Sequence, residues 1–337
     1  MTKKPLRLLA GDIGGTKTHL AIFSLQGESL TIERHQRYPT AGHASLNAII
    51  RKFLGRKDSA NQEPLAAACF GVPGPVKNGR AKPTNISWGV DGDELSDEFS
   101  IPTVTILNDL AANALGIVEL KPNDLAVIQE GDPEARGNRC VVSPGTGLGE
   151  AGLFWNGRHH RVWASEGGHA DFAPRNELEI AMLEYLIKRY GHVSYERIAS
   201  GMGIENIYQF LGDTRRGHEI ASIAAEIKAG DAGAVISEHS EAGDCPMCRQ
   251  TIEIFISVLG AEAGNMALKS MALGGVYLGG GIPVKMLPLL RGVGFINAFN
   301  DKGRHTSLLE SMPIKVILND DAALLGAARH AIDSIDV

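Results

Sequence analysis

The segment "TVTILNDLAANALG" at residues 103–116 has a second copy near the end of the chain, "IKVILNDDAALLGAA" at residues 314–328. Each copy begins with a short β-branched and apolar run, which predicts a buried strand. An Asn-Asp pair and an alanine-rich stretch follow, and they predict the start of a helix. The repeat therefore predicts two similar halves, each with a strand that leads into a helix. It leaves open which carboxylate, Asp109 or Asp320, takes part in chemistry.

Around the two copies, strand patterns alternate with helical patterns along the whole chain. Strands that alternate with helices indicate an α/β fold, and continuous apolar runs indicate strands inside a sheet. We expect strands at 6–13, 18–25 and 29–39, strands that run into loops at 65–76 and 274–283, a strand–turn–strand at 139–157, and the repeated strands at 103–107 and 314–318. We expect helices at 43–56, 180–191 and 251–272, and after each Asn-Asp pair.

Length and charge limit the classes of protein that fit. With 337 residues the chain is long enough for two domains with sizeable cores. Its 33 Lys and Arg against 39 Asp and Glu give a net charge of −6, which provides no basic field for nucleic acid. The first residues lack an apolar run of the length that a signal peptide or a membrane span needs. A cytoplasmic protein without a nucleic-acid or membrane partner is expected.

The four cysteines fit a reducing compartment. Cys69 and Cys140 stand in apolar strand-like runs, which predicts buried thiols. Cys245 and Cys248 form a Cys-x-x-Cys pair, but no second pair completes four zinc ligands. A local structural pair is the default interpretation, and its role stays open.

Two glycine-rich loops predict contacts with phosphate. The loop "GDIGGT" at 11–16 joins two strands, whereas the Walker loop and the Rossmann fingerprint lead from a strand into a helix. Gly14 and Gly15 allow backbone N–H groups to point at an anion, and Thr16 adds a hydroxyl. Asp12 would repel a phosphate unless a divalent cation lies between them, which implies Mg²⁺. The loop "SPGTGLG" at 143–149 is of the same type in the second half, so a tight turn is a poor explanation for both.

Other polar residues could bracket the vicinal hydroxyls of a sugar. Glu166 and His169 stand in the loop "SEGGHADF" at 165–172, and Glu196 stands in "GHVSYERIASGMGI". Taken singly, each has an alternative as part of a surface turn or a solvated helix face. Together they provide carboxylates that each accept hydrogen bonds from two hydroxyl groups.

The ordered set of motifs resembles the bacterial glucokinases of the hexokinase and actin-like ATPase superfamily, over about residues 6–330. The resemblance rests on "AGDIGGTKTHLAIF", "FGVPGPV", "ILNDLAANALG", "VVSPGTGLG", "SEGGHADFAP", "GHVSYERIASG", "LGGGIP" and "DKGRH". It implies a two-domain actin-like ATPase (ribonuclease H-like) fold with duplicated halves and an interdomain cleft. It also implies ATP-dependent phosphorylation of glucose at O6, the first step of glycolysis, with Mg²⁺ and a homodimer.

The resemblance also implies roles for individual residues. Asp109 is expected to be the general base, and Asp12 is expected to hold Mg²⁺ through water. Asp320, in the second copy, is expected to cap its helix. The expected sugar ligands are Asn108, Asp109, Glu166, His169 and Glu196. The expected nucleotide-binding residues are Gly11, Asp12, Ile13, Gly14, Gly15 and Thr16 in the first phosphate loop, Gly145, Thr146 and Gly147 in the second, and Gly279, Gly280 and Gly281 beside the adenosine.

The expected small domain is 1–118 with 313–337, and the expected large domain is 119–312. We expect the domains to be joined near 109–118 and 313–330 and to close on the sugar. The neighbouring repressor–ORF–kinase branch carries a Cys-rich zinc motif after its Gly-His phrase, but here Asp171 to Pro174 follow His169, so zinc is not implied.

Several alternatives remain open. A kinase for mannose, fructose or an N-acetylhexosamine would use the same hydroxyl-binding residues, and donors other than ATP are conceivable. A sugar-sensing repressor would need a DNA-binding extension before the first phosphate strand at about residue 6. A filament-forming ATPase would have no use for Glu166, His169 and Glu196.

Overall fold

The computed structural model describes residues 5–27, 29–55, 64–83 and 86–335. The chain divides into two compact units, and each is described here by itself. The first unit comprises Met1–Asp124, His159–Ala164 and Asn319–Val337, and the second comprises Leu125–Arg158 and Ser165–Leu318. The predicted domain boundaries lie at 118/119 and 312/313. That these parts are domains that move separately stays a prediction.

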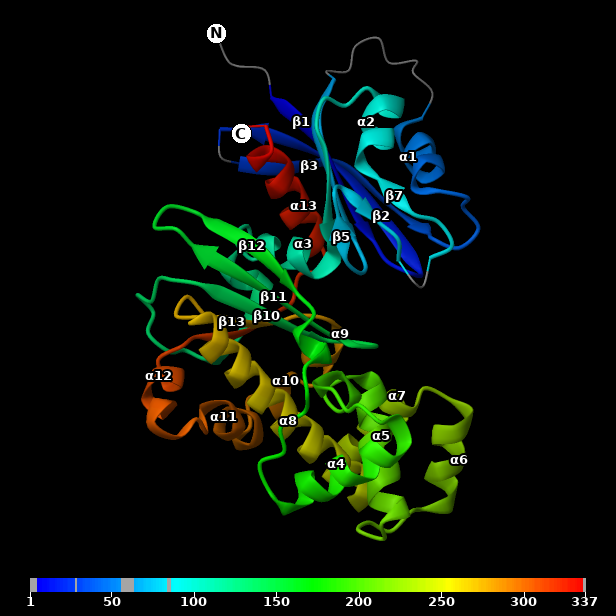
Figure 1. The fold of residues 1–337 in the computed structure, drawn as a ribbon, viewed down its shortest axis with the longest axis vertical. Helices are drawn as coiled ribbons and strands as arrows, with labels where there is room; N and C mark the ends of the chain where they lie inside the picture. Colours follow the sequence, from blue (N-terminus) through cyan, green and yellow to red (C-terminus); the bar gives the residue numbers. More distant parts are fainter. Residues whose placement is uncertain (1–4, 28, 56–63, 84–85, 336–337) are drawn as a thin grey trace. The chain divides into compact units, whose positions relative to one another are not determined.

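The first unit is built on a five-stranded sheet with the order β3-β2-β1-β4-β8 (Figure 1). β1 pairs antiparallel with β2, and β2 with β3, whereas β1, β4 and β8 run parallel. The strands are β1 (Leu6–Ile13), β2 (Lys17–Gln26), β3 (Ser29–Pro39), β4 (Leu65–Val72) and β8 (Val104–Asn108). β1 and β3 have the predicted bounds. The short strands β5 (Val76–Lys77), β6 (Arg80–Ala81) and β7 (Val90–Asp91) form a small antiparallel sheet.

Helices cover both faces of the first sheet because successive side chains of a strand point to opposite faces. Leu9 and Ile13 of β1 pack in one core cluster with α1 (Leu46–Leu54) and α2 (Gly92–Phe99). Leu8 and Ala10 of the same strand pack in another cluster with α13 (Ala322–Asp333). Figure 1 shows α13, in red, on the side of the sheet opposite to α1 and α2.

A second, six-stranded sheet has the order β12-β11-β10-β13-β14-β9, and all of its strands except β12 lie in the second unit. Its first five strands repeat the order of the first sheet, with β10 in the place of β1, β13 in that of β4 and β14 in that of β8. Within both sheets these three equivalent strands run parallel. The bounds are β9 (Leu125–Gln129), β10 (Arg139–Pro144), β11 (Leu148–Trp155), β12 (His160–Ser165), β13 (Val276–Leu278) and β14 (Ile314–Ile317). The predicted duplication of the fold is confirmed.

The core helix of the second unit is α8 (Pro246–Ser270), which Figure 1 shows between α11 and α5. Its length and composition would allow it to cross a membrane, but 78% of its apolar window is buried, as in the core helix of a globular domain. All four cysteines are buried, as predicted for Cys69 and Cys140. The other helices are α4 (Glu177–Tyr190), α5 (Gly201–Asp213), α6 (Ala221–Ala229), α7 (Ala232–Ala242), α9 (Gly281–Lys285), α10 (Leu287–Leu290), α11 (Val293–Asn300) and α12 (Thr306–Glu310).

The alanine-rich stretches of the repeated phrase form α3 (Asp109–Gly116) and α13, and these two helices cross within the first unit. A Cβ atom at Gly116 would overlap the carbonyl oxygen of Ala322, and one at Gly326 would overlap that of Ala112. The small residues of both copies therefore allow the two backbones to touch. This contact is one physical reason for the repeat.

Candidate active site

The first predicted phosphate loop is the turn of the β1–β2 hairpin. The Gly14 N–H donates to the Lys17 carbonyl at 2.8 Å and closes the turn. From outside the loop, the Thr40 hydroxyl donates to the Gly14 carbonyl at 2.7 Å, and the Thr40 N–H donates to the Thr16 carbonyl at 2.9 Å. Thr40 is itself buried and follows β3. It holds both ends of the turn, and sequence reasoning did not identify it.

Asp12 lies near the end of β1, and it faces the carboxylate of Asp109 from the first copy of the repeated phrase. Burial raises the pKa of Asp12 to about 6, with a further contribution from the charge of Asp109, while Arg37 acts in the opposite direction. Gly71 of β4 lies beside both segments. A Cβ atom there would lie 3.0 Å from Ala112 Cβ, 3.5 Å from Asp109 Cα and 3.7 Å from the Gly11 carbonyl oxygen, so the glycine allows α3 to pack closely on β4. The structure thus brings the predicted base to the predicted phosphate loop.

Asn108 caps the helix that begins at Asp109. Its Oδ1 accepts the N–H groups of Leu110 at 3.0 Å and Ala111 at 3.2 Å, and its Nδ2 donates to the Gly74 carbonyl at 3.2 Å. The side chain is therefore committed to the cap, and its predicted contact with the sugar stays a prediction. Asp109 stands at the first helical position, where the helix dipole favours a negative charge.

The second copy of the Asn-Asp phrase has a different local geometry, and the predicted cap is wrong. Asp320 is exposed, while the residue at the N-cap position of α13 is Asp321, whose side chain does not cap the helix. Asn319 Oδ1 instead accepts the Asp321 N–H at 2.8 Å. The Asp321 carboxylate lies 3.5 Å from the buried His19 and 3.5 Å from Arg37. The helix of the first copy begins at Asp109, whereas that of the second begins at Ala322, two residues after the equivalent position.

In the second unit, Glu196 joins the second phosphate loop to the predicted sugar loop. Its Oε2 accepts the Leu148 N–H at 3.0 Å, and a Cβ atom at Gly147 would overlap the same oxygen. Its Oε1 lies 3.8 Å from His169 Nδ1. The Gly201 N–H at the start of α5 donates to the Gly145 carbonyl at 2.8 Å and fixes the loop from the other side.

The predicted adenosine residues follow β13 and lie against the end of β10. The Gly279 N–H donates to the Val142 carbonyl at 3.0 Å. Gly280 has a φ of 84°, and a Cβ atom there would lie 2.9 Å from the Pro144 carbonyl oxygen. A residue other than glycine would be strained at this position. The glycine run therefore lets the end of β13 approach the strand that leads into the second phosphate loop.

Glu166 precedes and His169 ends a short 3₁₀ turn, η2 (Gly167–His169), and both are exposed. The structure brings together the second-unit residues Gly145–Gly147, Glu196, His169 and Gly279–Gly281. In the first unit it brings together the loop 11–16, Asp12 and Asp109. Among the described residues, no group of three or more His, Cys, Asp or Glu side chains is arranged to hold a metal ion.

With this geometry, comparison with known proteins becomes informative. The family model described as Glucokinase matches residues 9–334. The glucokinase of Trichormus variabilis is 40% identical over 338 residues, which cover 95% of this chain and 97% of that protein. The crystal structure of a glucokinase from an Antarctic psychrotroph superposes with a TM-score of 0.84 at 31% identity, covering 97% of this chain and 99% of that one.

A more distant solved structure supports the fold alone. It is a ROK family glucokinase from Streptomyces griseus in complex with glucose and AMPPNP, with 22% identity and a TM-score of 0.60, and the match covers 97% of this chain and 99% of that one. The duplicated sheets and the two hairpin loops define a sugar kinase with the actin-like ATPase fold. The chain belongs to the glucokinase family. The predicted fold class and family are both confirmed.

Sequence reasoning missed several residues that support this site. Thr40 follows the third strand without any motif of its own, and Asp321 was hidden by the neighbouring Asn-Asp pair. Glu150 and Glu262 are buried at 2% and 0% exposure in the second unit. A signal for both was available, because each is a single acid within a long apolar run.

Proposed function

We propose that this chain, as a member of the glucokinase family, transfers the γ-phosphoryl group of ATP to O6 of glucose with Asp109 as general base. The observation that carries the proposal is the position of Asp109 in the first unit. It follows a parallel strand at the start of α3, and its charge acts on Asp12 beside the first phosphate loop. A carboxylate there can accept the proton of the attacking hydroxyl as the new bond forms.

The two hairpin loops, 11–16 and 145–147, would receive the phosphates of ATP, and residues 279–281 would line the adenosine. In support, one structural relative was solved in complex with AMPPNP, an ATP analogue. Phosphoryl transfer depends chiefly on positioning and charge neutralisation, which fits loops made of backbone N–H groups.

The residues at the first loop also fit Mg²⁺. Asp12 offers oxygen donors, which Mg²⁺ prefers, and the pKa of Asp12 is raised partly by its repulsion from Asp109. A cation held by Asp12 through water would relieve that repulsion. When bound, Mg²⁺ would neutralise charge on the phosphates.

Glu166, His169 and Glu196 would bind the ring hydroxyls, with Asn108 and Asp109 on the side of O6. The coupled assay that tests the function compares glucose, mannose, fructose and N-acetylglucosamine with ATP. Glucose is expected to give the highest kcat/KM. A higher value for another hexose would assign that sugar to the same residues.

We also infer a cytoplasmic homodimer that acts at the first step of glycolysis. Its small domain would be 1–118 with 313–337, its large domain would be 119–312, and the two would close on the sugar. The net charge of −6 and the burial of α8 support the cytoplasmic location.

Removal of Mg²⁺ is expected to abolish turnover, and Asp12→Ala is expected to lose most of it in saturating Mg²⁺. The reason is that Asp12 beside an anion-binding loop requires a cation. Turnover is measured with and without excess chelator, and with Mg²⁺ restored. Asp320→Ala is the control, because it removes an exposed acid from the same unit. Undiminished turnover in excess chelator would contradict the assignment.

Glu166→Ala is expected to raise the Kd of glucose by roughly 10-fold or more, since sugar hydroxyls lose their acceptor at a cost of about 1–3 kcal/mol. The Kd of the nucleotide should not change. Titration calorimetry measures both. Asp171→Ala is the control, because this side chain is 91% exposed and pairs with His192 instead.

Glu196→Ala is expected to behave differently from Glu166→Ala. Because Glu196 accepts the Leu148 N–H beside the second phosphate loop, its loss should weaken both glucose and nucleotide binding. If both variants bind glucose as tightly as the parent, these residues do not form the sugar site.

A further inference from the structure

Two carboxylic acids lie against each other in the core of the second unit. Glu150 of β11 is 2% exposed and Glu262 of α8 is 0% exposed. The Oε1 atoms of both side chains are buried without a hydrogen-bond partner among the described residues. Neither acid belongs to a predicted motif. Two carboxylates in such a place cannot both ionise without a large cost, so the pair holds a proton.

The surrounding groups decide which acid holds the proton. Glu262 Oε2 accepts a hydrogen bond from Asn265 Nδ2 at 2.9 Å, and its Oε1 lies 3.8 Å from Lys269 Nζ. These contacts stabilise a negative charge on Glu262. Burial, followed by the charge of Glu262, raises the pKa of Glu150 to about 8. Glu150 is therefore the neutral member at neutral pH.

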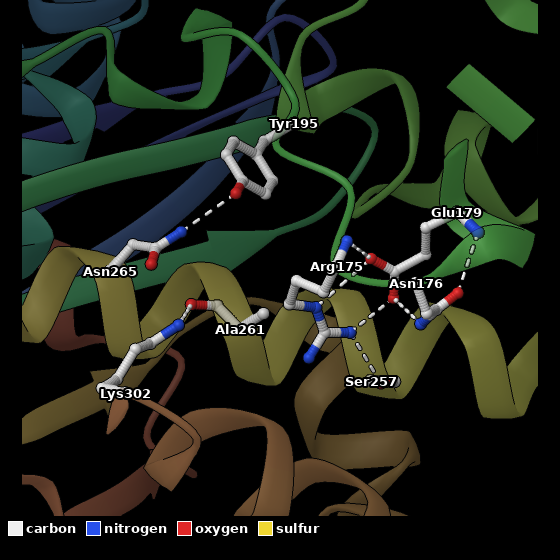
Figure 2. Close-up of polar contacts among 8 residues, drawn as sticks. All are labelled: Arg175, Asn176, Glu179, Tyr195, Ser257, Ala261, Asn265 and Lys302. Carbon is white, nitrogen blue, oxygen red and sulfur yellow. Dashed lines mark hydrogen bonds and ion pairs between the residues drawn. The ribbon is translucent and has the colours of Figure 1, made fainter. Parts of the chain in front are cut away.

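The other titratable and charged groups that face the pair come from three further elements. Asn265 also donates to the Tyr195 hydroxyl at 2.9 Å, and Lys302 Nζ donates to the Ala261 carbonyl at 3.0 Å (Figure 2). Burial raises the pKa of Tyr195 to about 12 and lowers that of Lys302. Cys140 of β10 faces Glu150, and burial raises the pKa of its thiol to about 12. The thiol and the phenol therefore stay neutral over the range in which Glu150 titrates.

The pair lies directly under the proposed sugar loop. A Cβ atom at Gly167 would overlap Glu150 Oε2, so this carboxyl fills the space beneath the loop backbone. The Gly167 N–H donates to Ser165 Oγ at 2.9 Å, and a Cβ atom at Gly168 would overlap the Leu148 carbonyl. The loop thus rests on β11 at Leu148 and Glu150.

The segment after the loop is fixed to α8 and α4. Arg175 donates to Ser257 of α8 at 2.8 Å and to Glu179 at 2.6 Å, and Asn176 Nδ2 donates to Glu179 at 3.1 Å (Figure 2). The Tyr195 N–H donates to the Ala170 carbonyl at 3.0 Å and the Phe172 N–H donates to the Val193 carbonyl at 3.0 Å, so a displacement of Gly167 would be taken up chiefly by residues 165–169. Glu166 and His169 lie in that interval.

We propose that Glu150 is a positioning residue of the sugar site. In its neutral form Glu150 supports Gly167 from below. When Glu150 ionises, the loop is displaced and glucose binding is weakened. The proposal rests on the proposed function of Glu166 and His169. Ionisation places a second negative charge beside Glu262 in a buried site, and repulsion between the two carboxylates would push Glu150 against the backbone of Gly167. Glucose affinity should therefore be constant near neutral pH and fall as the pH rises through about 8. The folded state favours the proton on Glu150, so stability should also decline towards that pH.

The test is the Kd of glucose between pH 6.5 and 9.5, measured by titration calorimetry on the full chain without nucleotide at constant ionic strength. In the parent, we expect the Kd to rise by roughly 10-fold over this range, which corresponds to a rise of about one unit in the pKa of Glu150 when glucose binds, with uptake of a proton. Glu150→Gln keeps the shape and a hydrogen-bonding head but cannot ionise, so its profile should be flat. Asp171→Asn, which changes an exposed acid at the end of the same loop, should keep the profile of the parent.

The outcomes separate this proposal from the function on which it rests. A parent that binds glucose with a flat profile overturns the role of Glu150 and leaves the sugar site intact. A Glu150→Gln variant that keeps the alkaline loss of the parent overturns it too. A parent that binds no glucose at any pH contradicts the function instead. If Glu150→Gln does not fold, as circular dichroism would show, the question is still decided by the pH profile of the parent and by its proton uptake on glucose binding, measured in buffers of different ionisation enthalpy.

Discussion

Asp109→Asn is expected to lower kcat by at least about 10²-fold, because the amide keeps the size and hydrogen-bonding ability of the side chain but cannot accept the proton of the sugar hydroxyl. The helix should tolerate the change, since Asn108 provides the cap of α3 with two hydrogen bonds. Turnover and melting temperature are measured together. A large loss of turnover with an almost unchanged melting temperature supports a chemical role.

The matched control is Asp320→Asn, at the corresponding position of the second copy. Asp320 is exposed and does not cap α13, so the change should affect neither turnover nor melting temperature. Glucose affinity of Asp109→Asn should stay close to that of the parent. If Asp109→Asn turns over normally, or if Asp320→Asn is the inactive variant, the general base was assigned to the wrong half.

Much of the fold was predictable because its signals are local. The continuous apolar run at 6–13 and the alternating run at 29–39 gave β1 and β3 with the observed bounds. The repeated phrase at 103–116 and 314–328 predicted equivalent places for β8 and β14, and the two sheets have that relation. In these segments, periodicity, turn residues and the duplicated order all indicate the same structure.

The misses have a different physical origin, since they depend on contacts between residues far apart in the sequence. Thr40 holds the first phosphate loop across 26 residues, and Glu150 meets Glu262 only when α8 packs on the sheet. The error at Asp320 was local. Two aspartates follow Asn319, and the pattern of cap residues does not say which one occupies the N-cap position of the helix. Capping preferences identify the residue types near a helix start more reliably than the register.

The crossing of α3 and α13 links the repeated phrase to both stability and catalysis. At Gly326 and Gly116 the two backbones are in contact, so a side chain cannot move aside to make room. Helix propensity favours Ala over Gly by up to about 1 kcal/mol. Overpacking typically costs about 1–3 kcal/mol and occasionally more, and an overlap with backbone atoms lies at the upper end, so the steric term should exceed the gain in propensity. Any shift of α3 also moves Asp109, which begins that helix.

Gly326→Ala is therefore expected to lower the melting temperature by roughly 5–10 °C and to reduce turnover even below the transition, because Asp109, the proposed general base, leaves its place beside Asp12. Gly212→Ala provides the matched control. Gly212 lies in α5, where a new Cβ atom would meet only Met247 Cε at 3.7 Å, so stability should stay equal or rise slightly. Thermal unfolding and a coupled kinase assay on both variants test the idea. If Gly326→Ala is as stable and as active as Gly212→Ala, the close crossing does not hold Asp109, and the shared glycines of the two phrases need another explanation.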